Sequence, residues 1–302
     1  MHCPLRKFTG KNGDYSKDKI VLITGATSGI GKETAIGTAK LGGTIVFTTR
    51  YMQKGELIKN AIVKASNNNK VDFLYCDLAS FDSIQSCCDQ FKAKYGQLHV
   101  LINNAGVWES KRKVSKDGIE STFAVNYLAP FLMTNLLLDA LKKGAPSRII
   151  NLTSGYHGGT INFDDVEFKR LFSGRKAYRQ SKLAMILFTK LLAEKLKGAG
   201  ITVNCVNPGF TATNLARELN LILRTFFKFF GKNPKKGAEA SIFLATSPEV
   251  ENITGQYFAN KKIRQSSKES NDMEVAKKLW DLSVEYVHFN KKKGGEGKTI
   301  QK

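Results

Sequence analysis

The chain has 302 residues, 42% of them hydrophobic and 10% aromatic, which excludes a disordered protein and allows one large α/β domain. Lysine and arginine number 47 against 26 acidic residues, so the net charge is +21. This charge leaves three interpretations open: repulsion between copies of a soluble protein, attraction to anionic lipid or nucleic acid, or attraction to a phosphate-rich ligand.

Other features of the composition exclude further classes of protein. The five cysteines form no Cys-x-x-Cys pair and no disulfide framework, which favours reduced thiols in a cytoplasmic compartment. No cysteine–histidine cluster has zinc spacing, so we expect no metal site. Residues 1–18 are expected to form a polar N-terminal leader without the apolar stretch of a signal peptide. No later segment reaches the ~20 apolar residues that span a bilayer.

Short β-branched runs alternate with segments of helical spacing along residues 19–290. The runs are almost continuously apolar, as in strands buried on both faces of a parallel sheet. They cover residues 19–24, 44–49, 71–76, 98–103, 148–153, 201–207 and 256–258, and the clearest helical windows are 80–95, 116–142 and 176–198. The alternation predicts a single doubly wound α/β domain of the Rossmann type, with a mostly parallel seven-stranded sheet and helices on both faces.

A glycine-rich loop, TGATSGIG at residues 24–31, joins the first predicted strand to a helical pattern that begins near Lys32. Glycine allows a tight turn and a close approach of the main chain to a pyrophosphate, and the helix N-terminus attracts the anion. Because the loop lies between a strand and a helix, it predicts a dinucleotide-binding site. The residues assigned to it are Gly25, Thr27, Ser28, Gly29, Ile30 and Gly31.

The ends of the second and third strands bear on the choice of dinucleotide. Where NAD-binding proteins of this fold carry an acidic residue, this chain has Arg50, whose planar guanidinium suits a 2′-phosphate. We therefore expect NADP(H), although a solvated arginine at a strand end remains the alternative. Asp77 and Leu78 follow the third strand and are assigned to the adenine site. Asp77 either accepts from the adenine amino group or caps the next helix.

Tyr178 and Lys182 lie four residues apart in the helical window 176–198 and so share one helix face. A nearby ammonium group favours the tyrosinate, so we expect Lys182 to lower the pKa of Tyr178 and to enable proton exchange with a substrate oxygen. The pair alone is common in proteins. Ser154 adds weight, because it follows the fifth strand at the sheet edge where open α/β sheets bind ligands.

Together these motifs resemble the short-chain dehydrogenase/reductase family, from about residue 17 to 288. The matching motifs are TGATSGIG, Asn103-Asn104-Ala105-Gly106, Asn126, Ser154, Tyr178 with Lys182, and Asn207-Pro208-Gly209. The resemblance implies that Tyr178 is the general acid/base and that Lys182 lowers its pKa and binds the nicotinamide ribose. It implies that Ser154 hydrogen-bonds the substrate oxygen and that the main chain of Asn126 holds a water in a proton relay.

The resemblance also implies the remaining cofactor contacts and the reaction. Besides Tyr178 and Lys182, the expected contacts are Asn103, Ala105, Gly106, Pro208, Gly209 and Thr211. Hydride would pass directly between nicotinamide and an alcohol or carbonyl carbon, without a metal. The rival hypothesis is a catalytically silent protein that senses NADP(H). Such proteins usually lack the tyrosine or the lysine, and both are present here.

The stretch from Ser154 to Tyr178 resembles that of the retinol dehydrogenase-like branch, so a lipophilic aldehyde or ketone is the expected substrate, with retinal-like compounds among the candidates. Tyr127 and Pro130 depart from the residues usual after the family's asparagine. His157 is expected to be held by loop packing rather than to act in catalysis.

Three further expectations concern the periphery of the chain. Residues 210–236 are expected to form a lid over the substrate, and their aromatic, basic part at 219–230 either only covers the cleft or also contacts an anionic membrane. The protein would then be cytoplasmic, free or peripheral on a membrane surface. Residues 291–302 are expected to form a disordered basic tail. No nucleic-acid-binding motif accompanies the charge, so nucleic acid is disfavoured, and a homo-oligomer stays open.

Overall fold

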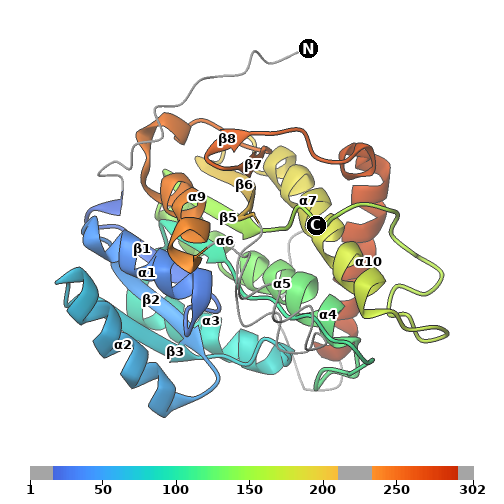
Figure 1. Cartoon of the computed structure of the whole chain (residues 1–302), viewed down its shortest axis with the longest axis horizontal. Coiled ribbons are helices and arrows are strands. Elements are labelled where there is room, and N and C mark those ends of the chain that lie inside the picture. The colour runs from blue at the N-terminus through green and yellow to red at the C-terminus, as the bar shows by residue number, and fades with distance from the viewer. Residues whose placement is uncertain (1–15, 210–232, 292–302) are drawn as a thin grey trace.

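The computed structural model describes residues 16–209 and 233–291 of the chain. Its strands form one sheet in the order β3-β2-β1-β4-β5-β6-β7-β8 (Figure 1). Neighbouring strands are parallel except β7 and β8, which are antiparallel. The strands are β1 (Ile20–Ile23), β2 (Thr44–Thr49), β3 (Val71–Tyr75), β4 (Val100–Asn103), β5 (Ser147–Leu152), β6 (Ile201–Asn207), β7 (Tyr257–Ala259) and β8 (Lys262–Ile263).

The predicted doubly wound α/β architecture is confirmed, because the strand order runs outward from β1 on one side and from β4 on the other. The sheet nevertheless has one strand more than the seven predicted. This strand, β8, has two residues and follows a turn in which Asn260 and Lys261 have φ angles of +50° and +58°. A strand of this length shows no periodicity, and the turn lacks the glycine that usually signals such a hairpin.

Helices cover both faces of the sheet, as the alternation predicts. One face carries α1 (Gly29–Lys40), α2 (Met52–Ser66) and α9 (Pro234–Thr246). The other carries α3 (Phe81–Tyr95), α4 (Ser121–Phe123), the π-helix η2 (Ala124–Leu128), α5 (Ala129–Leu136), α6 (Leu138–Lys143) and α7 (Gly174–Lys195). The C-terminal helix α10 (Met273–Lys291) packs on α7, and η4 (Pro248–Val250) and η5 (Lys268–Asn271) are short 3₁₀ turns.

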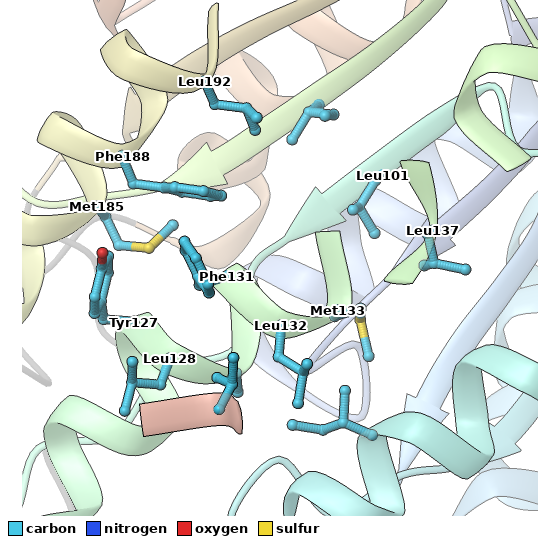
Figure 2. Packing of buried hydrophobic residues seen from close by; sticks show 14 of the residues in the cluster. Leu101, Tyr127, Leu128, Phe131, Leu132, Met133, Leu137, Met185, Phe188 and Leu192 are labelled. Carbon is cyan, nitrogen blue, oxygen red and sulfur yellow. The ribbon is translucent and has the colours of Figure 1, made fainter. Parts of the chain in front are cut away.

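Side chains of the central strands alternate between two hydrophobic cores. Leu101 of β4 joins the core under α3, α5 and α7, whereas its neighbour Ile102 joins the core under α1 and α9. Figure 2 shows the first core, in which Phe131 of α5 meets Phe188 of α7 with 5.4 Å between ring centroids. Trp280 of α10 packs edge-on against Phe131 at 4.9 Å. Helix α10 therefore helps to hold α7 against the sheet.

The predicted helical windows are found, with different boundaries. Helix α1 begins at Gly29 rather than near Lys32, because the end of the glycine loop already forms the first helical turn. The window 116–142 contains four short helical pieces rather than one helix. Pro130 lies in the first turn of α5, where its missing N–H prevents a continuous α-helix from residue 121 onward.

The edges of the domain also differ from the predicted boundaries. Residues 16–18 of the predicted leader are part of the fold, since Ser16 is buried and the Asp18 carboxylate lies 3.0 Å from Lys70 Nζ. Residues 233–236 of the predicted lid form the N-cap and first residues of α9, and the rest of it, 210–232, lies outside the described residues. Most of the predicted tail lies outside them too. Within the described ranges, no helix has both the length and the apolarity needed to cross a membrane.

Candidate active site

The strand order reverses between β1 and β4, and the glycine loop lies at the carboxyl ends of these two strands. Gly25 has a φ angle of +68°, and a Cβ there would lie 2.8 Å from the Cα of Ala105 in the loop after β4. A Cβ at Gly31 would overlap the side-chain amide of Asn104. That amide donates to the main-chain oxygens of Thr24 and Gly25 at 2.8 and 3.1 Å. The two loops are thus joined with no room for a larger residue.

The first turn of α1 faces this loop and has no side-chain cap. Ser28 occupies the N-cap position, but its side chain makes no capping hydrogen bond, and the first turn contains no acidic residue. By contrast, Ser80, Ser173 and Asn233 cap α3, α7 and α9 with their side chains. The N-terminus of α1 is therefore suited to an anion such as a phosphate. Thr27, Ser28 and Gly29 are half-buried here, whereas Ile30 and Gly31 are buried.

Tyr178 and Lys182 project from α7 beneath the loops that follow β4 and β5, and both are buried, at 6% and 4% exposure. Lys182 Nζ donates to the main-chain oxygen of Leu152 at 3.2 Å and lies 5.6 Å from the centre of the Tyr178 ring. Burial lowers the pKa of Lys182 to about 8. Burial also raises the pKa of Tyr178 to about 12, against the opposing effect of its hydrogen bond with Ser154.

The net pKa shift of Tyr178 is upward, opposite to the lowered pKa that the sequence led us to expect, because burial outweighs the hydrogen bond with Ser154. Removal of the phenol from water disfavours the tyrosinate more than the neighbouring groups of the protein favour it. Tyr178 is therefore a phenol at neutral pH, with a proton to donate. The sequence places the lysine one turn away but does not give the depth at which the phenol is buried.

Asn126 lies in the π-helix η2, a rare form of helix that often marks functional sites. Its side chain accepts from the N–H of Val107 at 2.7 Å and donates to the oxygen of Val107 and to Ser181 Oγ. A Cβ on Gly106 would lie 3.4 Å from Asn126 Oδ1 and 3.5 Å from Lys182 Nζ. The loop after β4 thus brings Asn126 next to the catalytic lysine predicted from the sequence.

Ser154 lies at the end of β5, and its Oγ accepts a hydrogen bond from the N–H of Tyr156 at 3.0 Å. His157 is held at both ring nitrogens: Nδ1 lies 2.7 Å from the oxygen of Ser154, and Nε2 accepts from the N–H of Ser267 at 3.1 Å. This arrangement agrees with the expectation that His157 is held by packing, with one partner in its own loop and the other in the segment before η5. Burial also lowers its pKa, which favours the neutral ring.

Comparison with known proteins gives this geometry its context. A family profile described as short chain dehydrogenase matches residues 19–222. The chain belongs to the short-chain dehydrogenase family. It is 41% identical to human retinol dehydrogenase 13, over 89% of this chain and 84% of the relative, and 38% identical to human polyprenol dehydrogenase over 89% and 84%. Membership makes the protein an oxidoreductase that binds a nicotinamide cofactor.

Solved structures agree with this short-chain dehydrogenase fold. A protein from Mycobacterium paratuberculosis superposes with a TM-score of 0.76 at 27% identity, covering 93% of this chain and 97% of that one. The 3-ketoacyl-(acyl-carrier-protein) reductase of Brucella melitensis, determined with NADH, superposes with a TM-score of 0.64 at 26% identity. That match covers 80% of this chain and 96% of the reductase.

In this short-chain dehydrogenase, the residues predicted to select the cofactor lie at the ends of β2 and β3. Arg50 is exposed, and among residues 16–209 and 233–291 no carboxylate forms an ion pair with it. Asp77 lies 3.0 Å from Lys116 Nζ and accepts from the N–H of Ala79. Helix α3 is capped by Ser80, so the alternative role of Asp77 as a helix cap is wrong. Leu78 is half-buried beside it.

The remaining predicted contacts fall into two groups. The Asn103 side chain is buried and donates to Thr134 Oγ1 and Asn151 Oδ1, so only its main chain can approach a cofactor. Pro208 and Gly209 follow β6 and are half-buried, with the N–H of Gly209 donating to Asn207 Oδ1 at 2.9 Å. Thr211 lies outside the described residues. Among the described residues, no group of three or more His, Cys, Asp and Glu could hold a metal ion.

Three residues that the sequence analysis gave no role also lie at the site. Asn104 ties the glycine loop to β4, as described above. Trp108 stacks on the ring of Tyr178 with 4.4 Å between centroids, and Tyr156 stacks on Trp108 at 5.9 Å. The signal for Asn104 was its place in the NNAG motif. No sequence pattern signals the stacking of Trp108, because it joins side chains from three distant segments.

Proposed function

We propose that the protein transfers a hydride between NADP(H) and an alcohol or carbonyl compound. The observation that carries the proposal is the buried Tyr178 phenol, which lies beside Ser154 and Lys182 at the carboxyl edge of the sheet. We further propose a lipophilic aldehyde or ketone as substrate, with retinal-like compounds among the candidates. The names of two relatives, a retinol dehydrogenase and a polyprenol dehydrogenase, support a lipophilic alcohol or its carbonyl product.

In this mechanism Tyr178 donates its phenolic proton to the substrate oxygen during carbonyl reduction and accepts it during alcohol oxidation. A pKa of about 12 keeps the proton in place at neutral pH until the oxygen becomes basic. The ammonium group of Lys182 then stabilises the tyrosinate. Ser154 donates a hydrogen bond to the same oxygen as negative charge develops there. The nicotinamide, when bound, supplies or receives the hydride.

The residues around the glycine loop fit a dinucleotide. The uncapped start of α1 offers main-chain N–H groups to a pyrophosphate, and the missing side chains at Gly25 and Gly31 let the two loops meet closely behind it. The exposed guanidinium of Arg50 suits a 2′-phosphate, which is why we propose NADP(H) over NAD(H). Asp77 and Leu78 would border the adenine, and the main chain of Ala105, Gly106, Pro208 and Gly209 the rest of the cofactor.

The proton that Tyr178 donates must be replaced from solvent, and Asn126 supports a route for it. Asn126 lies in the π-helix η2, where the α-helical pattern of main-chain hydrogen bonds is interrupted. We propose that the main-chain oxygen of Asn126 holds a water that links Lys182 to solvent.

A protein that only senses NADP(H) could use Lys182 to bind the cofactor, but it would have no need of the buried Tyr178 phenol beside it. Burial of an ammonium group costs free energy, as the lowered pKa of Lys182 indicates. A site that retains Lys182, Tyr178 and Ser154 together at this cost is better explained by turnover than by binding alone.

The decisive experiment is a substrate screen that follows the absorbance of the reduced nicotinamide. Purified protein is incubated with NADPH or NADH and with aldehydes and ketones of increasing apolar length. We expect oxidation of NADPH in preference to NADH and a kcat/KM that rises with apolar length. If no aldehyde, ketone or alcohol changes the redox state of either cofactor, the proposed activity is wrong.

Location is a separate proposal, supported by the sequence. We propose a cytoplasmic enzyme that contacts anionic membranes peripherally through the aromatic, basic segment 219–230, because phenylalanines enter the acyl boundary while cations meet the headgroups. Each basic residue near such a surface contributes on the order of 1 kcal/mol, and salt screens this contribution. Cosedimentation should therefore require anionic liposomes and decline at high salt. Protein that stays in the supernatant with anionic vesicles at low salt would rule this contact out.

A further inference from the structure

Three aromatic rings form one stacked column at the proposed active site. Trp108, in the loop after β4, lies 4.4 Å from Tyr178 between ring centroids, with 24° between the planes. Tyr156, in the loop after β5, lies 5.9 Å from Trp108 with 13° between the planes. Near-parallel offset stacking of this kind is a preferred geometry for aromatic pairs. One end of the column is therefore the group that would exchange the proton.

The column is fixed by contacts outside the rings themselves. The guanidinium of Arg179 lies 5.4 Å above the outer ring, Tyr156, and the N–H of Tyr156 donates to Ser154 Oγ at 3.0 Å. The loop that carries Trp108 packs directly on the start of α7, because a Cβ at Gly174 would overlap the main-chain oxygen of Glu109. The rings are thus held in relation to both Ser154 and Tyr178.

Exposure along the column rises from one end to the other. Tyr178 is 6% exposed and Tyr156 is 38% exposed, with Trp108 half-buried between them. The aromatic cluster of Phe131, Phe188 and Trp280 is buried throughout, and it packs a core. The column of Tyr178, Trp108 and Tyr156, by contrast, leads from the proposed reacting group to solvent. Its aromatic edges are therefore available to a ligand rather than to core packing.

We infer that Trp108 and Tyr156 form an aromatic wall that selects carbonyl compounds whose carbonyl carbon is attached to a flat aromatic ring, and the corresponding alcohols. The faces of Trp108 are covered by Tyr178 and Tyr156, so the ring of such a substrate would meet the edges of the wall, an edge-to-face geometry that aromatic pairs also favour, while its oxygen reaches Ser154 and Tyr178. A rigid ring also loses little conformational freedom on binding. The inference rests on the proposed oxidoreductase function and confines its lipophilic substrates to aryl carbonyl compounds; retinal-like compounds, whose carbonyl is attached to a polyene chain, would fall outside this class.

The test compares two aldehydes of similar size and shape, benzaldehyde and cyclohexanecarbaldehyde, with NADPH as reductant. Their intrinsic reactivities differ, so the informative quantity is the change in their kcat/KM ratio between wild type and variant. We expect Trp108→Leu to lower the aryl-to-cyclohexyl ratio about fivefold, and Trp108→Phe to retain most of it. Any effect of Trp108 on the position of Tyr178 changes both substrates alike and cancels in the ratio.

Tyr156 provides a second pair of variants. It is exposed, so Tyr156→Leu carries less risk to folding than Trp108→Leu, and it should lower the same ratio, whereas Tyr156→Phe should retain it. An unchanged ratio in both leucine variants, with turnover of both aldehydes intact, would overturn the aromatic wall and leave the oxidoreductase function standing. Failure of the wild type to oxidise NADPH with any carbonyl compound would instead overturn the function.

Fluorescence gives a readout that does not depend on turnover. The chain has two tryptophans, so Trp280→Phe leaves Trp108 as the only tryptophan signal. In this background, with NADPH bound, benzyl alcohol should change the emission of Trp108 at concentrations where cyclohexylmethanol does not. Equal responses to both alcohols would show that Trp108 does not distinguish aromatic rings, contrary to the inference.

Discussion

The glycine loop between β1 and α1 and the catalytic centre on α7 are built in opposite ways. The loop depends on glycines, which have no side chain: a Cβ at Gly25 would lie 2.8 Å from the main chain of Ala105. The catalytic centre depends on side chains that are costly to bury. Burial raises the pKa of Tyr178 and lowers that of Lys182, and both shifts favour the neutral form of the side chain. Substitutions in the loop should therefore lower both the stability of the fold and the affinity for the cofactor. Substitutions at the catalytic centre should lower turnover without lowering stability.

The largest effect should come from Tyr178→Phe, which removes the phenolic proton and keeps the ring that stacks on Trp108. Loss of a general acid costs up to about 10⁴-fold, so we expect kcat to fall at least a thousandfold while the Kd for NADPH and the melting temperature change little. Stopped-flow kinetics, NADPH titration and thermal melts give the three values. Retention of a tenth of the wild-type kcat would remove Tyr178 from the mechanism.

A matched pair of glycines tests the loop. Gly25 and Gly96 have φ angles of +68° and +69°, so alanine would take a positive φ at both positions, but a Cβ at Gly96 meets no atom within 4 Å. Gly25→Ala should thus lose about 1–3 kcal/mol of unfolding free energy more than Gly96→Ala, because only it forces the loops apart. NADPH affinity should fall in the same variant. Equal losses in urea melts of the two proteins would mean that the close approach is unimportant.

Lys182→Met tests whether the catalytic lysine costs stability. Its folded pKa of about 8 lies below its usual 10.5, so the unfolded chain binds more protons between these values and wild-type stability should rise with pH across this window. At pH 7 the charged side chain is buried at a cost. Methionine removes it, and we expect a gain on the order of 2 kcal/mol, together with loss of turnover.

The control for this prediction lies on the same helix. Lys176 is exposed, so Lys176→Met should leave both the unfolding free energy and its dependence on pH almost unchanged. Chemical denaturation at pH 7 and at pH 10 measures both variants. A Lys182→Met protein that is less stable than wild type at pH 7 would contradict the cost that we assign to burial.

The smallest effect should be that of Arg50→Ala, because Arg50 is exposed at the end of β2, where we propose that the 2′-phosphate of the cofactor binds. Only the contact with the 2′-phosphate is lost, so the KM for NADPH should rise about tenfold while that for NADH stays nearly constant. Initial rates with both cofactors measure the two values. Equal changes would mean that Arg50 has a structural role instead.

The sequence predicted the architecture well where the pattern was local. The strands at 44–49 and 201–207 were located to the residue, because each is a short run rich in apolar and β-branched residues between turns. The motifs also identified the group of Asn126, Tyr178 and Lys182, which the structure brings together around Gly106 and the end of β5.

What the sequence missed depends on contacts between distant segments or on depth. The strand β8 is too short to show a period, and the cap of α3 proved to be Ser80 because the turn after Asp77 extends further than expected. The pKa of Tyr178 rises because of its burial, which spacing along a helix does not reveal. The stacking of Trp108 joins two loops and helix α7, which no local pattern connects.

The packing of α10 has a consequence for synthesis of the chain. The nucleotide-binding half, from β1 to α3, consists of strands and helices that are consecutive in the sequence and can dock as they emerge from the ribosome. Helix α7, by contrast, packs against α10, whose buried residues Leu279, Trp280 and Val287 are translated after every strand of the sheet. A nascent chain should therefore form its glycine loop well before the helix that carries its proton donor is fully packed.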